Sequence, residues 1–150
     1  MAFAILLRVE TQSAYAAELL HSQHTAPLSA RDAALCTELV QGTLRWQGML
    51  DFLAQQLAHM PWGSLDPEVK VALRMGLYQL RFLSRMPARA AIYETVELVK
   101  SAGKQSAAGM VNAVLRRGAQ ADLPSLRPPA TPELEWQSIE LSHQIGRAHV

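Results

Sequence analysis

The sequence predicts an all-α fold. Apolar residues recur every three or four positions along most of residues 1–118, which is the spacing of helices with one buried face. Alternating apolar and polar strands joined by Asn-Gly or Asp-Gly turns are absent from the sequence. Of the 150 residues, 49% are hydrophobic and 18% are charged, a composition typical of a single globular domain.

The N-terminal stretch is expected to form a helix over residues 2–10. After an interruption at residues 11–13, a second helical stretch runs through Leu20. Arg8 and Glu10 cut the first apolar run short, and no basic residue precedes it, so it does not have the pattern of a signal peptide. No run of about 18 apolar residues occurs anywhere, so no membrane helix is expected.

A third helix is expected to begin after Ser29. Ser29 is a typical N-cap residue, and Asp32 follows it at the spacing of a capping box. Gly42 is expected to loosen or end this helix, because glycine is a poor helix former. The apolar residues that recur at helical spacing here are Leu35, Leu39 and Val40.

Two further helices are predicted over residues 47–60 and 66–86. The first is amphipathic. The second has the clearest bounds in the chain, because Asp66 is a typical N-cap and Pro67 fits the first helical position. At its other end, Pro87 disfavours helical geometry in the residue that precedes it.

One side of the 66–86 helix carries a cationic strip. At 100° per residue, four basic residues fall in a narrow stripe beside the apolar face: Lys70, Arg74, Arg81 and Arg85. Nine of the 14 basic residues lie between positions 67 and 117, although the net charge of the chain is only +1. A basic middle region favours an anionic partner, with nucleic acid the leading candidate, and a solvated charged face is the alternative.

The last two predicted helices run from about Ala88 to Gly103 and from Gly109 to Gly118. Gly103 is expected to cap the first of them, because glycine readily adopts the left-handed conformation that ends many helices. Asn112 stands inside the apolar stretch of the second helix, where its amide competes for backbone hydrogen bonds. A buried polar group left unpaired costs about 1–3 kcal/mol, so Asn112 is expected to have a partner.

No catalytic or metal-binding residue is predicted. The single cysteine, Cys36, excludes a disulfide framework and a cysteine-rich zinc site within this chain, and it favours a reducing, cytoplasmic setting. His21 and His24 lie three residues apart but have no carboxylate or cysteine companions in a ligand pattern, so no metal is expected. No nucleophile–base pair stands out, and no catalytic activity is expected of this chain alone.

Four motifs together resemble a known family. They are ELVQGTLRW (38–46), ALRMGLYQLRFL (72–83), MPARAAIYETVELVK (86–100) and MVNAVLRR (110–117). In this order and spacing they are similar to the NusB-like domain. The similarity is closest to the N-terminal domain of the RsmB/Sun/Fmu family of rRNA cytosine-C5 methyltransferases, and it covers about residues 2–118.

The resemblance implies an all-α, RNA-binding NusB-like bundle of about six to seven helices in two sub-bundles over residues 1–118. In the full enzymes this domain precedes a Rossmann-like catalytic domain that uses S-adenosylmethionine. Residues 119–143, which are rich in proline, are accordingly expected to be a linker toward a missing catalytic domain. Residues 144–150, QIGRAHV, resemble the in-frame translation of a common sequencing adapter and are expected to be a non-native tail.

The function that the resemblance implies is RNA binding. The domain would position small-subunit rRNA, or support its own missing catalytic domain, without binding a cofactor itself. The cofactor S-adenosylmethionine would belong to the catalytic domain. Two alternatives remain open: a free-standing NusB-type transcription antitermination or termination factor, and a structural docking domain with little RNA affinity.

Six basic residues are the candidates for RNA contact: Lys70, Arg74, Arg81, Arg85, Arg116 and Arg117. For the adjacent Arg116 and Arg117, compensation of the helix dipole is the alternative to phosphate contact. Asn112 is expected to hydrogen-bond to Glu94 or to a backbone group of a neighbouring helix, rather than to touch RNA directly. Gln79 is expected to be buried and hydrogen-bonded in the same way.

Overall fold

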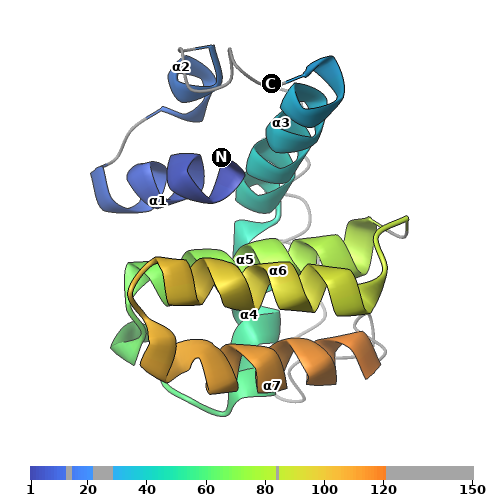
Figure 1. The fold of residues 1–150 in the computed structure, drawn as a ribbon. Coiled ribbons are helices and arrows are strands. Elements are labelled where there is room, and N and C mark those ends of the chain that lie inside the picture. Colours follow the sequence, from blue (N-terminus) through green and yellow to red (C-terminus); the bar gives the residue numbers. More distant parts are fainter. Residues whose placement is uncertain (13–14, 22–28, 84, 121–150) are drawn as a thin grey trace, which may run out of the picture.

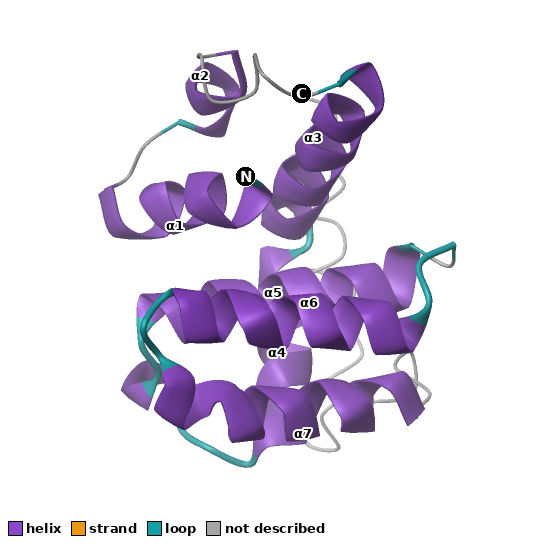
Figure 2. Ribbon diagram, viewed as in Figure 1, coloured by secondary structure: helices purple, strands orange, loops and turns teal. Residues whose placement is uncertain are grey.

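The computed structural model describes residues 1–12, 15–21, 29–83 and 85–120, and within them it contains helices and no strand (Figure 1, Figure 2). The seven α-helices of this part are α1 Ala2–Gln12, α2 Ala16–His21, α3 Ala30–Arg45, α4 Gln47–Ala58, α5 Pro67–Phe82, α6 Ala88–Ser101 and α7 Ala108–Gln120. Two short 3₁₀ helices, Trp62–Ser64 and Gln105–Ala107, precede α5 and α7. The all-α prediction is confirmed. Most of the expected linker and all of the expected tail, residues 121–150, lie outside the described residues.

The helices form two sub-bundles that share α5. Helices α1, α2 and α3 gather at one end of the molecule, and α4, α5, α6 and α7 form the other (Figure 1). Helix α5 packs against α4, α6 and α7 in its own sub-bundle and also against α1 and α3 in the other one. None of the described helices has the length and apolar character needed to cross a membrane.

The core is centred on α5. Of the eleven residues from Val69 to Gln79, all except Lys70 are buried. Neighbouring helices therefore cover almost the whole circumference of this part of α5. The largest side chains removed from solvent are aliphatic, and they include Leu73 and Leu77 of α5 and Leu115 of α7. Burial of each such side chain contributes about 1.5–3 kcal/mol, and these residues therefore hold the sub-bundles together.

Local signals in the sequence define three helix ends. The Ser29 side-chain oxygen accepts a hydrogen bond from the Asp32 backbone nitrogen at 3.1 Å, as expected for an N-cap. Asp66 occupies the N-cap position of α5, although its carboxylate pairs with Lys104 at 3.2 Å instead of capping the helix. Gly103 has a φ of 81° after α6. Its nitrogen donates to Lys100 O and that of Lys104 to Val99 O, the two bonds of a Schellman motif.

The prediction that Gly42 ends or loosens its helix is wrong. Helix α3 continues to Arg45, and Gly42 is buried inside it. A Cβ atom at this position would overlap the ring of Tyr78, which packs across Gly42 from α5. The glycine therefore permits a close approach between α3 and α5. The sequence shows glycine's low helix propensity but not the aromatic ring that requires it.

Two other predictions about the helices differ from the structure. Leu35 shares helical spacing with Leu39 and Val40 but is 37% exposed. Helix α5 ends at Phe82, four residues before the predicted end at Met86, and Met86 instead closes a turn by donating to Leu83 O. Pro87 directly precedes α6. It therefore disfavours helical geometry at Met86, which lies in the turn that connects α5 to α6 and not at the end of α5.

Candidate nucleic-acid interface

Arg74 does not lie on an exposed cationic strip, and this part of the prediction is wrong. Its side chain is buried at the junction of α1, α4 and α5. Nε and Nη2 donate to the two carboxylate oxygens of Asp51, at 2.5 and 3.1 Å, and Nη1 donates to Glu10 at 3.0 Å. All three nitrogens have carboxylate partners and the side chain is buried, so the guanidinium joins three helices and is not accessible to a phosphate.

Burial shapes the charge state of this junction. It raises the pKa of Asp51, and the hydrogen bond and charge of Arg74 offset that rise only in part. Burial by itself would lower the pKa of Arg74, but the hydrogen bonds and charges of Asp51 and Glu10 outweigh this, and the Arg74 pKa is raised. The junction thus holds a permanent positive charge between two carboxylates.

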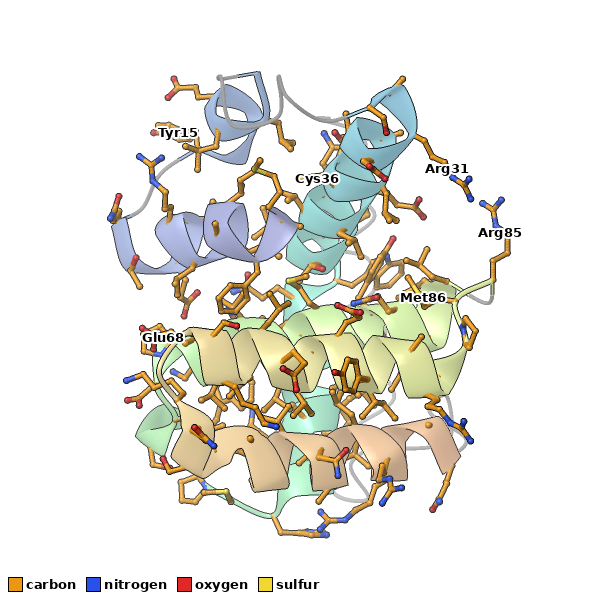
Figure 3. The ribbon with its side chains drawn as sticks, viewed as in Figure 1. Tyr15, Arg31, Cys36, Glu68, Arg85 and Met86 are labelled. Carbon is orange, nitrogen blue, oxygen red and sulfur yellow. The ribbon has the colours of Figure 1, made fainter. Side chains whose placement is uncertain are left out.

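The other three residues of the predicted cationic strip, Lys70, Arg81 and Arg85, lie in environments that differ from one another. Lys70 is half-buried, with its ammonium 5.8 Å from the centre of the Trp62 ring. The guanidinium of Arg81 lies 5.3 Å from the Phe82 ring centre, and its Nε and Nη1 are buried without a hydrogen-bond partner in the part of the chain that the structure describes. Arg85 lies in the segment that connects α5 to α6, where its side chain is exposed and extends outward (Figure 3). These residues do not form one continuous surface.

The predicted polar residues, Gln79, Asn112 and Glu94, differ in whether they are buried and hydrogen-bonded. Gln79 is buried, and its amide nitrogen donates to Met75 O, one turn earlier in the same helix, at 3.2 Å. Asn112 is only half-buried and Glu94 is exposed, and no hydrogen bond joins them or otherwise engages the Asn112 amide within the described residues. The predicted bridge between α6 and α7 is therefore not formed. The Asn112 side chain instead lines a groove at the surface.

Adjacent arginines at the end of α7 have different surroundings. Nη1 of Arg117 donates to the carbonyl oxygen of Leu57, in the last turn of α4. This bond satisfies a helix-end carbonyl and places a positive charge at the negative end of the α4 dipole. Arg116 points to the groove that also contains Asn112. Arg116 is thus available to a ligand, whereas Arg117 already has a structural partner.

A groove with a volume of about 630 Å³ lies between α6 and α7. Its wall on α6 is made by Arg89, Ile92, Tyr93, Val96, Glu97 and Lys100, and its wall on α7 by Ala108, Gly109, Asn112, Arg116 and Gln120. The size falls within the range of roughly 300–1,000 Å³ that is typical of ligand pockets. Apolar side chains alternate here with cationic and amide groups.

The groove carries a net positive charge. Glu97 is its one acidic residue, and this carboxylate pairs with Lys100 at 3.4 Å. Arg89 and Arg116 have no carboxylate partner among the described residues, and both are exposed. Two unneutralised guanidinium groups therefore stand at the rim, where a phosphate would meet them without first displacing an ion pair.

Arg89, Tyr93 and Lys100 were not among the predicted site residues. The signal that could have identified them is their spacing. Tyr93 lies four residues after Arg89, and Lys100 lies seven after Tyr93, so that all three share one face of α6. The opposite face contains Ala91, Thr95 and Val99, all buried. An aromatic residue on the cationic side of an amphipathic helix was therefore visible in the sequence.

Cys36 and possible metal ligands do not contribute to this interface. Cys36 is buried in α3, and burial raises the pKa of its thiol, which keeps the sulfur protonated at neutral pH. Among the described residues no three His, Cys, Asp or Glu side chains are grouped so that they could hold a metal ion.

Two helical sub-bundles sharing a central helix, with a basic groove on one side, define the class of protein as an all-α domain with a surface suited to anions. The chain belongs to the NusB family, whose model matches residues 1–120. The structure is similar to the solution structure of NusB from Aquifex aeolicus, with a TM-score of 0.66 and 26% sequence identity. The similarity covers 89% of this chain and 92% of that one.

Relatives among curated proteins are longer. The chain is 38% identical over 125 residues to a probable ribosomal RNA small subunit methyltransferase B of Synechocystis, covering 81% of this chain and 28% of the relative. It is 49% identical over 87 residues to ribosomal RNA small subunit methyltransferase B of Pseudomonas putida, covering 58% of this chain and 20% of the relative. The chain thus spans between a fifth and three tenths of these relatives and matches their N-terminal region.

Proposed function

We propose that this chain is an RNA-binding NusB module that positions small-subunit rRNA for a cytosine-C5 methyltransferase. The observation that carries the proposal is the 38% identity over 125 residues to a small-subunit rRNA methyltransferase relative. This match covers 81% of the chain. Methyl transfer from S-adenosylmethionine would belong to the catalytic part of such a protein, since this sequence has no glycine-rich cofactor loop following a strand.

The electrostatics support a role in holding RNA. Arg85, Arg89 and Arg116 are exposed and have no carboxylate partner among the described residues. Cations of this kind neutralise phosphates and release counterions, which gives affinity without sequence preference. Such contacts suit a module that orients a long RNA while another domain selects the target base.

Salt dependence of RNA binding tests this role. For the chain with a small-subunit rRNA fragment, Arg85→Gln is expected to lower the slope of log affinity against log salt by roughly 0.7–0.9, the value for one lost phosphate contact. Lys104→Gln is the matched control, because the Lys104 ammonium already pairs with Asp66 at 3.2 Å and with Glu68 at 3.9 Å. Absence of measurable RNA binding at low salt would overturn the proposal in favour of a docking domain.

A second candidate is a free-standing antitermination-type factor. It is favoured by the Aquifex structure, because this chain matches that NusB chain over 92% of its length. A chimera separates the two functions. The N-terminal region of the Pseudomonas putida methyltransferase is replaced by residues 1–120 of this chain, and methylation of small-subunit rRNA is measured. Activity well above that of the catalytic part alone supports the methyltransferase module, and no gain supports the separate factor.

A further inference from the structure

We propose that the groove between α6 and α7 binds an unstacked base of single-stranded RNA, with Tyr93 as the stacking platform and Arg89 and Arg116 as phosphate contacts. The inference rests on the proposed RNA-binding function and assigns it to a site. It differs from a general cationic surface because it requires an aromatic ring, an amide and a hollow of nucleotide size in one place.

Tyr93 is unlike the other aromatic residues of the sub-bundle. Trp46, Tyr78 and Phe82 pack on one another, with ring centres 5.2 Å apart for Trp46 and Phe82 and 5.0 Å apart for Tyr78 and Phe82. Tyr93 is 62% exposed, and its ring stacks on no other ring in the described part of the chain. A ring held on a rigid helix with its face open offers the surface on which any base can stack.

Positive charge and amide groups surround this ring. Arg89 lies one helical turn before Tyr93, and Arg116 faces them from α7. A base on Tyr93 would therefore have guanidinium groups on either side to take its flanking phosphates. Asn112 lines the groove from α7 and has both donor and acceptor atoms without partners in the described structure, which are the groups that read the edge of a base.

The same features favour a single strand over a duplex. Bases in an A-form duplex are stacked and paired, and a protein reaches them only through a shallow minor groove or a deep, narrow major groove. A concave site of about 630 Å³ with an aromatic side chain in its wall can take a splayed-out base, which a regular duplex does not present. The occupant is thus a loop, a bulge or an unpaired end.

Fluorescence anisotropy with a labelled 12-nucleotide single-stranded RNA and the whole chain tests the proposal. Tyr93→Ala is expected to weaken binding about tenfold or more, because one base–aromatic stack is lost. Tyr93→Phe keeps the ring and is expected to bind within about threefold of the unaltered chain. The matched control is Tyr15→Ala, since Tyr15 is 73% exposed and lies before α2, in the other sub-bundle.

A second variant examines base reading. Asn112→Ala is expected to reduce the differences in affinity among poly-U, poly-A and poly-C 12-mers, whereas Arg116→Gln is expected to weaken all three alike. Thermal unfolding of each variant shows whether it is folded, and exposed Tyr93 can be removed without opening the core.

The outcomes separate this inference from the function on which it rests. If Tyr93→Ala binds the 12-mer as tightly as the unaltered chain while Arg85→Gln lowers the salt slope, RNA binding stands and the groove is not the base site. A 12-base-pair duplex that binds as tightly as the single strand would also overturn the inference. If the chain binds neither RNA, both the proposed function and the groove assignment fail.

Discussion

The junction of α1, α4 and α5 and the groove between α6 and α7 both contain arginines, but the two regions use them in opposite ways. At the junction, Arg74 is 5% exposed and both neighbouring helices contribute a carboxylate to it. In the groove, Arg89 and Arg116 are exposed, and the one carboxylate present pairs with Lys100. The contrast shows what makes an arginine structural. Carboxylates that converge on it decide this, more than its position on a helix, and an arginine without them is available to a ligand.

The largest effect is expected from breaking the junction. Arg74→Met leaves Asp51 and Glu10 without their shared counter-charge, and loss of one partner from a buried ionic group typically destabilises a protein by about 3–5 kcal/mol. Urea denaturation measures the change. Arg89→Met is the control from the groove and should shift the free energy of unfolding by less than about 0.5 kcal/mol. Equal losses in the two variants would remove the distinction between the regions.

A smaller loss is expected from the close approach of α3 and α5, on the junction side of the molecule. Gly42→Ala introduces a methyl group into the space of the buried Tyr78 ring, and overpacking of this kind costs about 1–3 kcal/mol. Gly109→Ala is the matched control in α7, because a Cβ there meets nothing within 4 Å. It should be neutral or stabilise the helix by up to about 1 kcal/mol. Thermal and urea unfolding of both variants compare them directly.

The pH dependence of stability sharpens the account of the junction. Burial raises the pKa of Asp51, so the folded state binds a proton more readily than the unfolded state. The contribution of Asp51 to the free energy of unfolding therefore falls as pH rises from the ordinary aspartate range through the raised pKa. The loss is about 1.4 kcal/mol for each unit by which the folded pKa exceeds the unfolded pKa. Removing Arg74 raises the Asp51 pKa further. The stability deficit of Arg74→Met should then be smaller at pH 4.5 than at pH 7, and a deficit that grows on acidification would contradict this.

The smallest effect on stability is expected from the two arginines that close α7. Arg117→Gln removes the hydrogen bond to Leu57 O and should destabilise the chain by about 1 kcal/mol, since the side chain is exposed. Arg116→Gln should leave the free energy of unfolding unchanged and weaken RNA binding instead. Denaturation and RNA titration of both variants measure the two effects. Comparison of the two variants thus tests whether adjacent arginines have different roles, Arg117 in stability and Arg116 in RNA binding.

The sequence predicts features that depend on neighbouring residues along the chain. Ser29, Pro67 and Gly103 mark helix ends because capping and left-handed geometry are set within one turn. The burial of Arg74 could not be predicted in this way, because its partners Glu10 and Asp51 lie 64 and 23 residues away. A helical wheel places charges on one side of a helix without showing which helices cover that side. The groove was missed for the same reason, since it requires the pairing of α6 with α7.

The shared position of α5 has a consequence for how the chain folds. Neither sub-bundle can be separated from the other without exposing apolar surface of α5, because the same helix supplies part of both cores. The two sub-bundles are therefore expected to unfold together, in one cooperative transition. Backbone amides in the middle of α5 would exchange with solvent only when the whole domain opens. Those of α2 would exchange through local fluctuations, because among the described helices α2 packs mainly against α1 and α3.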